Sequence, residues 1–278
     1  MKIDAHQHYW KLQRGDYGWL APELAELYRD FGPEELKPAL EASGIGRSIA
    51  VQAAPTIAET EYLLALCLQE STLAGVVGWV DLEDERVEER LDSLLSSGYL
   101  LGIRPMLQDL PDDRHILRPA VLKGLQAVAD RGLTLDLLVR PRHLLHAAEM
   151  LDRVASLRAV VDHIGKPDME RGDDRGVWEE GMAALAANSR TACKLSGLVT
   201  EAGSAWSPEL IAPYTDRAVS LFGPRRLLYG SDWPVCLPFA GYAEVLKLAD
   251  RLLPKHWGPS EKEAVMGGNA MEWYPLKE

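Results

Sequence analysis

The chain has only three cysteines among its 278 residues, and they stand far apart at Cys67, Cys193 and Cys236. Such spacing suits neither a disulfide framework nor a CxxC metal site, so we expect small buried side chains in a reducing compartment. The N-terminus lacks the apolar run of a secretory signal, and no stretch reaches the ~18 apolar residues of a membrane-spanning helix. The sequence therefore predicts a cytoplasmic protein that does not insert into a membrane.

Positive charge is also scarce, because 30 basic side chains stand against 42 acidic ones and the formal net charge is −12. A surface of this sign disfavours DNA, RNA and anionic membranes as partners. Hydrophobic residues make up 47% of the chain, which is enough to fill a large core and excludes disorder over most of its length. We expect a globular protein with a small-molecule ligand. Association with further copies of the chain stays open.

A regular alternation of short apolar runs and longer helical patterns extends over the whole chain. The apolar runs predict eight strands, at Lys2–His8, Arg47–Gln52, Gly75–Asp81, Leu100–Met106, Leu133–Val139, Arg158–His163, Thr191–Ser196 and Arg226–Ser231. Helical spacing of leucine and alanine predicts helices at Glu34–Ala42, Ala58–Gln69, Arg86–Leu95, Ala120–Asp130, Arg142–Val154, Val177–Ala187, Pro208–Leu221, Tyr242–Leu252 and Ser260–Trp273. This alternation predicts an α/β fold, a (β/α)8 TIM-type barrel that forms a single domain over residues 1–278. A doubly wound open sheet is the alternative, but no GxGxxG follows an early strand.

Polar residues follow several of these strands, at the end where the active sites of such barrels lie. His6 and His8 alternate along the first strand and share a predicted face with Asp4. Two histidines about 7 Å apart on one strand can converge on a single ion or water. His163 follows the sixth strand and Asp232 the eighth. Structural roles compete here, since a rim histidine can simply hold its loop and an aspartate can cap a helix.

Other strand ends carry further polar side chains. Arg104, late in the fourth strand, is a candidate clamp for an anionic oxygen. Taken alone, the remaining polar residues are more often structural than catalytic. Asp136 and Lys194 in particular suit an ion pair inside the barrel, where an unpaired charge is costly.

The ordered set of strand-end motifs resembles the amidohydrolase superfamily. The matching segments are residues 4–10, 51–53, 59–60, 78–82, 102–104, 162–167, 194–198 and 230–234. They are most similar to the branch of sugar-acid lactonases, of L-fuconolactonase type, to which 2-pyrone-4,6-dicarboxylate lactonase is related. The resemblance implies a (β/α)8 fold and the hydrolysis of a cyclic ester. It also implies functional roles for His6, His8, His163 and Asp232.

The resemblance also bears on cofactors. Many amidohydrolases bind one or two divalent metals, but the pattern for two is incomplete here. No lysine ends the fifth strand, and the seventh offers Ser196 and no histidine. The lactonase branch is associated with activity that needs no metal, so we expect that no cofactor is required. The alternative is one zinc or manganese ion, held by His6, His8, His163 and Asp232.

These residues form a hypothesis for the opening of a sugar-acid lactone. Asp232 is the expected general base for a water poised by His6 and His8. His163 and Arg104 are expected to stabilise the developing oxyanion. The residues expected to bind the sugar are Gln52, Trp79, Asp136, Ser196 and Trp233. Two alternatives stay open: a non-catalytic barrel, and a metal-dependent hydrolase or non-oxidative decarboxylase of a small carboxylic acid.

Overall fold

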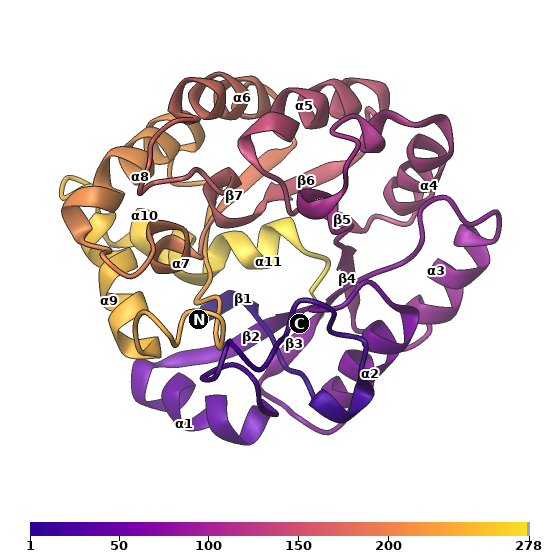
Figure 1. Ribbon diagram of the computed structural model, residues 1–278, viewed down its shortest axis with the longest axis horizontal. Helices are drawn as coiled ribbons and strands as arrows, with labels where there is room; N and C mark the ends of the chain where they lie inside the picture. The colour runs from indigo at the N-terminus through magenta and orange to yellow at the C-terminus, as the bar shows by residue number, and fades with distance from the viewer. Residues whose placement is uncertain (277–278) are drawn as a thin grey trace.

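The computed structural model describes residues 1–276 and contains one parallel sheet of eight strands, each paired with the next in chain order. The strands are β1 (Lys2–Gln7), β2 (Ile45–Val51), β3 (Leu73–Gly78), β4 (Leu100–Ile103), β5 (Thr134–Leu137), β6 (Arg158–Val161), β7 (Thr191–Leu195) and β8 (Leu227–Tyr229). The amide of Asp232 donates to the carbonyl of His6 at 2.8 Å, and the amide of His8 donates to that of Trp233 at 2.7 Å. These bonds join the segment after β8 to β1 and close the ring, so the predicted (β/α)8 barrel is confirmed (Figure 1). Residues 277 and 278, which the predicted domain includes, lie outside the described residues.

Helices surround the ring of strands (Figure 1). They are α1 (Pro33–Ser43), α2 (Ile57–Cys67), α3 (Val87–Leu95), α4 (Pro119–Asp130), α5 (Leu144–Arg153), α6 (Arg175–Ala187), α7 (Leu198–Ala202), α8 (Pro208–Phe222), α9 (Tyr242–Leu252), α10 (Pro259–Glu263) and α11 (Asn269–Trp273). Short 3₁₀ turns lie at Leu12–Arg14, Leu107–Asp109, His115–Leu117, Pro141–His143 and Asp162–Gly165. Local chemistry sets several helix starts: the hydroxyl of Thr56 accepts from the Glu59 amide at the start of α2, and Ser207 with Pro208 begins α8.

The structure differs from the predicted helices in two places. The short helix α7 directly after β7 was not predicted, because five residues are too few to show a helical period. The single helix predicted at Ser260–Trp273 is broken by a π-helical turn at Ala264–Gly268. Gly267 in this turn packs against the start of β1, where a Cβ would lie 2.3 Å from the carbonyl oxygen of Met1. The close approach of two backbones interrupts the helix there.

Two apolar layers fill the molecule. Most buried apolar side chains lie between the strands and the surrounding helices. A smaller cluster, which includes Ile3, Val160, Ala192 and Leu228, joins side chains from seven strands with α11. Figure 1 shows α11 crossing the middle of the ring. It lies at the strand starts, where the Thr134 hydroxyl donates to the carbonyl of Trp273 at 2.6 Å. The apolar cluster thus closes one end of the barrel and leaves the other for polar side chains.

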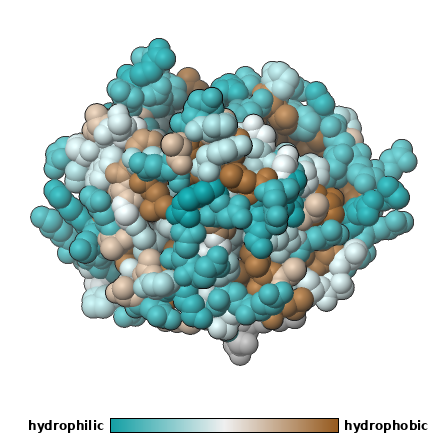
Figure 2. All heavy atoms as spheres, turned by 60° about the horizontal axis from the view of Figure 1, so that its bottom comes forward, coloured by the Kyte–Doolittle hydropathy of each residue, from teal (hydrophilic) through white to brown (hydrophobic). Residues whose placement is uncertain are grey.

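The molecular surface carries the excess of acidic residues. The face drawn in Figure 2 is mostly hydrophilic, with hydrophobic residues showing between the polar ones. Among residues 1–276, no helix combines the length and the apolar character that crossing a membrane requires.

Candidate active site

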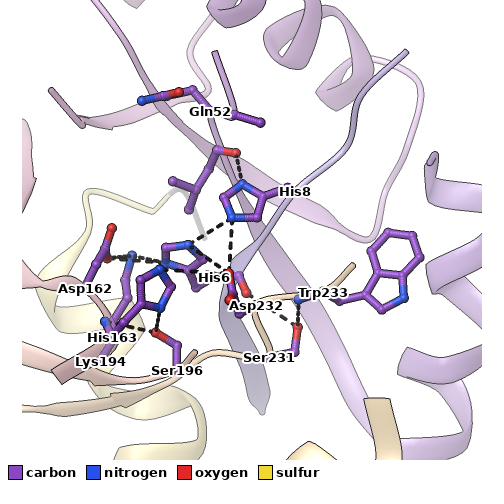
Figure 3. Close-up of polar contacts among 12 residues, drawn as sticks. His6, His8, Gln52, Asp162, His163, Lys194, Ser196, Ser231, Asp232 and Trp233 are labelled. Atoms are coloured by element: carbon purple, nitrogen blue, oxygen red, sulfur yellow. Dashed lines mark hydrogen bonds and ion pairs between the residues drawn. The ribbon is translucent and has the colours of Figure 1, made fainter. Parts of the chain in front are cut away.

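Three imidazoles and a carboxylate meet at the carboxyl ends of β1, β6 and β8, as Figure 3 shows. Nε2 of His6 lies 3.2 Å from Nε2 of His8, and the latter lies 3.3 Å from Oδ1 of Asp232. Oδ1 of Asp232 is also 3.8 Å from Nε2 of His6 and 3.9 Å from Nε2 of His163. All four residues are at most 4% exposed. The structure therefore brings together the four residues that the sequence analysis placed at separate strand ends.

A β-bulge in β1 corrects the predicted faces of this strand. The pairing of β1 with β2 shifts by one residue between Asp4 and Gln7. As a result Asp4 does not share a face with His6 and His8. Its carboxylate instead accepts from the backbone amide of Ser231 at 2.9 Å and from the hydroxyl of Tyr242, on the surrounding helix α9, at 3.1 Å. Strict alternation predicted the wrong face because it assumed an unbroken strand.

The loops that carry His163 and Asp232 have unusual backbone conformations. Among residues 1–276, the non-glycine residues with positive φ are His163, Ile164, Lys166 and Asp232, with φ between 47° and 59°. This region is unfavourable for side chains with a Cβ, and most of all for a β-branched residue such as Ile164. Strain of this kind persists where the surrounding structure enforces it, and it gathers at functional sites.

A buried network of charges lies beneath the imidazoles, towards the barrel interior. Lys194 forms an ion pair with Asp136, and its Nζ lies 3.0 Å from Oδ1 of Asp162. Arg104 places Nη1 3.2 Å from Oδ2 of Asp162. The hydroxyl of Tyr274 donates to the other oxygen of Asp136 at 2.7 Å. Two cations and two carboxylates balance, which is what burial of charge requires.

Neighbouring groups orient each imidazole. Nδ1 of His8 donates to the carbonyl of Val51 at 2.7 Å, and Nδ1 of His163 lies 2.9 Å from the hydroxyl of Ser196. Nδ1 of His6 lies 3.2 Å from Nζ of Lys194. Every ring therefore has a fixed contact at Nδ1 and turns Nε2 towards Asp232.

Burial and neighbouring charges shift the pKa values of several of these groups. Burial lowers the pKa of His163 to about 4, and it lowers the pKa of His6 well below its ordinary value against the opposing charge of Asp162. Burial by itself would raise the pKa of Asp232, but the adjacent His163, His8 and His6 hold that pKa below its usual range. At neutral pH the site presents an ionised carboxylate beside the neutral imidazoles of His6 and His163.

A cavity of about 170 Å³ opens onto His8, Arg104, His163 and Asp232. The sequence analysis did not select several other residues that line it, among them Trp19, Met106, Gln108, Asp109, Leu138 and Thr200. Within the described chain, the Thr200 hydroxyl and the Gln108 amide oxygen are buried without a hydrogen-bond partner, so both are available to a ligand. Trp19 and Thr200 lie in segments that follow β1 and β7. Both segments follow strands on the side of the barrel where active sites lie, and this position was a signal that the sequence offered. A larger cavity of about 480 Å³ adjoins the first and shares Lys166 and Thr200 with it.

The residues predicted to bind the sugar are placed less favourably, since none lines the 170 Å³ cavity. Asp136 is fully buried with both oxygens engaged, so its place favours the ion-pair interpretation and not sugar contact. Trp233 packs on Tyr9 and Phe31, and in Figure 3 its indole lies away from the imidazoles. The side-chain amide of Gln52 donates to the carbonyl of Arg104 at 2.8 Å, and Trp79 lines a separate cavity. Ser196 reaches the site only through His163.

The donor atoms of His6, His8 and Asp232 suit one divalent metal. Their mutual distances are 3.2, 3.3 and 3.8 Å. Ligand atoms bound tetrahedrally at ~2.0–2.1 Å from zinc lie roughly 3.3–3.4 Å apart, so this set has the required spacing. His163 provides a further nitrogen on the same side of Asp232. The chain's own residues therefore fit a mononuclear site.

Comparison with known proteins gives a consistent result. A family model described as amidohydrolase matches residues 3–276. An L-fucono-1,5-lactonase from Burkholderia ambifaria is 40% identical over 99% of this chain and 96% of its own length. A second L-fucono-1,5-lactonase, from Burkholderia multivorans, is 37% identical over 100% of this chain and 97% of its own. The crystal structure of an amidohydrolase from Burkholderia multivorans with bound zinc is 36% identical, covers 100% of both chains and has a TM-score of 0.95.

Proposed function

The chain belongs to the amidohydrolase family, and from this premise we propose that it is a lactonase that opens the ring ester of a sugar-acid lactone by hydrolysis. Two relatives that match it over the full length are L-fucono-1,5-lactonases, so L-fucono-1,5-lactone is the first substrate to test. The observation that carries the proposal is the Asp232 carboxylate, held ionised among three imidazoles at the wall of a small cavity.

In this mechanism Asp232 is the general base. A water beside His8 loses a proton to the Asp232 carboxylate as its oxygen attacks the lactone carbonyl. The neighbouring imidazoles of His6 and His8 hold the water and fix its direction of approach. Because Asp232 is 3% exposed, few bulk waters compete for its oxygens. The low pKa of Asp232 keeps the carboxylate ionised, but a low pKa also makes this carboxylate a weak base. The orientation of the water therefore carries much of the rate enhancement.

Two groups are placed to stabilise the oxyanion that forms on the carbonyl oxygen. His163 lines the cavity and, with Nδ1 turned to Ser196, presents Nε2 on the side of Asp232. Arg104 also lines the cavity, and its Nε has no protein partner among the described residues. Donors fixed in advance stabilise developing charge without reorganisation. Asp232 then returns its proton to the departing ring oxygen, which leaves a hydroxy acid.

The sugar contacts come from the cavity wall. The free Thr200 hydroxyl and the Gln108 amide oxygen suit ring hydroxyls, and Trp19 offers an aromatic surface. Met106 and Leu138 add an apolar side, which suits the deoxygenated carbon of a 6-deoxy sugar acid.

A divalent metal, if bound by His6, His8 and Asp232, would polarise the carbonyl or lower the pKa of an attacking water. Metal-dependent hydrolysis is the second candidate function, and the spacing of these three donor atoms favours it. Chelation separates the two candidates, as discussed below.

The test is hydrolysis of a panel of aldonolactones by the purified full-length chain, followed with a pH indicator. The panel contains L-fucono, D-arabinono, L-rhamnono and L-galactono lactones, with 1,4- and 1,5-ring forms compared where both are available. We expect turnover well above the spontaneous rate, with L-fucono-1,5-lactone among the best substrates. Absence of turnover on every lactone, with and without added zinc or manganese, would contradict the proposal.

A further inference from the structure

The side chain of Glu59 is buried, yet it does not cap the helix in which it lies. Glu59 stands three residues after Thr56, whose hydroxyl accepts from the Glu59 amide at the start of α2. In a Thr-x-x-Glu pattern of this kind, the glutamate side chain usually accepts from the backbone amide of the capping residue. Here the amide of Thr56 donates to the carbonyl of Ala54 at 2.9 Å. The carboxyl group of Glu59 is therefore available for contacts outside the helix.

The two oxygens of Glu59 join two segments that are distant in the sequence. Oε2 accepts from the hydroxyl of Tyr17 at 2.7 Å, in the segment between β1 and α1. Oε1 accepts from the backbone amide of Ala53 at 3.1 Å, in the turn after β2. Nε of Arg14 lies 3.5 Å from Oε2 and places a positive charge beside the carboxyl group. Displacement of this group would leave buried donors without acceptors, which is costly, so the two segments are held together.

The contact with Ala53 leads to the catalytic cavity. The carbonyl of Ala53 accepts from the indole Nε1 of Trp19 at 2.8 Å. Both residues line the cavity of about 170 Å³ that opens onto Asp232. Ala53 is thus bound through its amide to Glu59 and through its carbonyl to Trp19. Since Trp19 also follows Tyr17 by two residues, Glu59 holds the indole from two directions.

The indole of Trp19 has fewer polar contacts than the charged residue across the cavity. Nη1 of Arg104 lies 3.2 Å from Oδ2 of Asp162, and this ion pair is independent of the segment after β1. Among residues 1–276, the hydrogen bond to Ala53 is the polar contact that the indole makes. The position of Trp19 therefore depends on this carbonyl more than the position of Arg104 does.

We propose that Glu59 is a positioning residue for substrate binding, which holds the indole of Trp19 at the wall of the catalytic cavity. An aromatic face at this place packs against the ring of a bound sugar lactone. Such a contact is made equally before and during the reaction, so its loss raises KM and leaves kcat nearly unchanged. The kinetic consequence rests on the proposed lactonase function, whereas the position of Trp19 can be measured without a substrate.

The first experiment follows Trp19 directly, by ¹⁹F spectroscopy of the full-length protein labelled with 5-fluorotryptophan. The chain has eight tryptophans, and Trp19→Phe assigns the Trp19 signal by its loss. We expect Glu59→Ala to shift or broaden this signal. Glu59→Gln retains an oxygen for the Ala53 amide and should leave the signal close to that of the wild type. An unchanged Trp19 signal in folded Glu59→Ala protein would overturn the proposal, whatever the enzyme hydrolyses.

A pair of hydroxyl deletions provides the same test if Glu59→Ala does not fold. Tyr17→Phe removes the hydrogen bond to Glu59 and keeps the buried aromatic ring. Tyr62→Phe is the matched control, because the Tyr62 hydroxyl, also near Arg14 but on α2, has no hydrogen-bond partner among the described residues. Tyr17→Phe should change the Trp19 signal and Tyr62→Phe should not. Equal responses to the two deletions would contradict the proposal.

The second experiment measures KM and kcat for L-fucono-1,5-lactone in a double-mutant cycle. Trp19→Ala and Glu59→Ala should each raise KM about 3- to 10-fold, the range of one well-placed aromatic contact. The kcat of each variant should stay within about threefold of the wild type. The double variant should have the KM of Trp19→Ala alone, because residues that act through one contact do not have additive effects. Additive effects on KM, or a loss confined to kcat, would show that Glu59 does not act through Trp19.

The two experiments separate this inference from the proposed function. A chain that hydrolyses no lactone contradicts the proposed function, while the ¹⁹F signal of Trp19 still decides whether Glu59 holds the indole. A lactonase whose Trp19 signal is indifferent to Glu59 keeps the proposed function and loses the inference.

Discussion

Gly197 leaves the space that the ring of His163 occupies. A Cβ at position 197 would lie 2.5 Å from Nδ1 of His163, closer than side-chain atoms approach. Gly197 also has a φ of +62°, which side chains rarely adopt. The second residue after β7 thus controls the position of the imidazole after β6, although neither strand pattern indicates such a dependence.

The first prediction follows from this contact. Gly197→Ala should displace the His163 ring and lower kcat by about 10- to 100-fold, because misplacement of a reacting group by about an ångström has an effect of that order. Gly15→Ala is the control, since Gly15 has a similar φ of +71° but nothing within 4 Å of its Cβ position. Both variants should lose about 1–2 kcal/mol through the unfavourable φ alone. Steady-state kinetics and thermal unfolding separate the two effects, and an active Gly197→Ala enzyme would show that the His163 position is not critical.

The second prediction concerns the general base. Asp232→Asn keeps the shape of the side chain and removes the proton acceptor, so kcat for lactone hydrolysis should fall by about 10²- to 10⁴-fold. Asp216→Asn removes the same charge from an exposed residue of α8 that lines neither cavity of the site and should change kcat little. If Asp232→Asn turned over at close to the wild-type rate, another group would have to be the base.

The third prediction is the effect of chelation. The proposed mechanism obtains its base and its oxyanion donors from the chain's own residues, so protein treated with a chelator and freed of zinc should keep most of its lactonase rate. Metal content before and after treatment is measured by mass spectrometry alongside the assay. Loss of activity that zinc or manganese restores would instead favour the metal-dependent hydrolase.

The fourth prediction is a pH-dependent stability. Burial raises the pKa of Glu59 to about 7, although Tyr17 and the amide of Ala53 donate to its carboxylate. Between its ordinary pKa of 4.5 and about 7, the folded state binds this proton more tightly than the unfolded state does. Stability should therefore fall as pH rises through this window, by about 3 kcal/mol at most from this residue.

The Glu59 effect is measured by urea unfolding of the wild type and of Glu59→Gln at pH 5 and pH 8. The variant should lose this part of the decrease, because an amide does not titrate. Glu61→Gln, on the exposed side of the same helix, should keep the wild-type dependence. Identical pH profiles for the wild type and Glu59→Gln would rule out a raised pKa for Glu59.

The architecture was largely readable from the sequence. All eight strands lie where the apolar runs predict them, because strands buried on both faces need near-continuous apolar residues such as Val76-Val77 and Val160-Val161. The break at Gly267 and the bulge in β1 were not readable, since each depends on the approach of a segment distant in the sequence. A local pattern carries no information on such approaches.

The candidate site divides in the same way. His6, His8, His163 and Asp232 were found from their places at strand ends, because the barrel brings those ends together whatever the loops do. The residues around the ligand cavity were largely missed, and the chosen Trp233 and Asp136 turned out to be engaged elsewhere. Loop side chains such as Trp19 and Thr200 reach the cavity through conformations that no periodicity encodes.

The sequence by itself therefore determined the barrel, the family and the four side chains at its mouth, since each follows from strand periodicity or from a motif at a strand end. Only the tertiary structure decided which nitrogen of His6 meets Lys194 and which atoms around the cavity remain free for a ligand. Those relations join β1 to β7 and β4 to β6, across the ring of the barrel. They depend on atomic positions that are fixed to within a few tenths of an ångström, and only the packed molecule defines such positions.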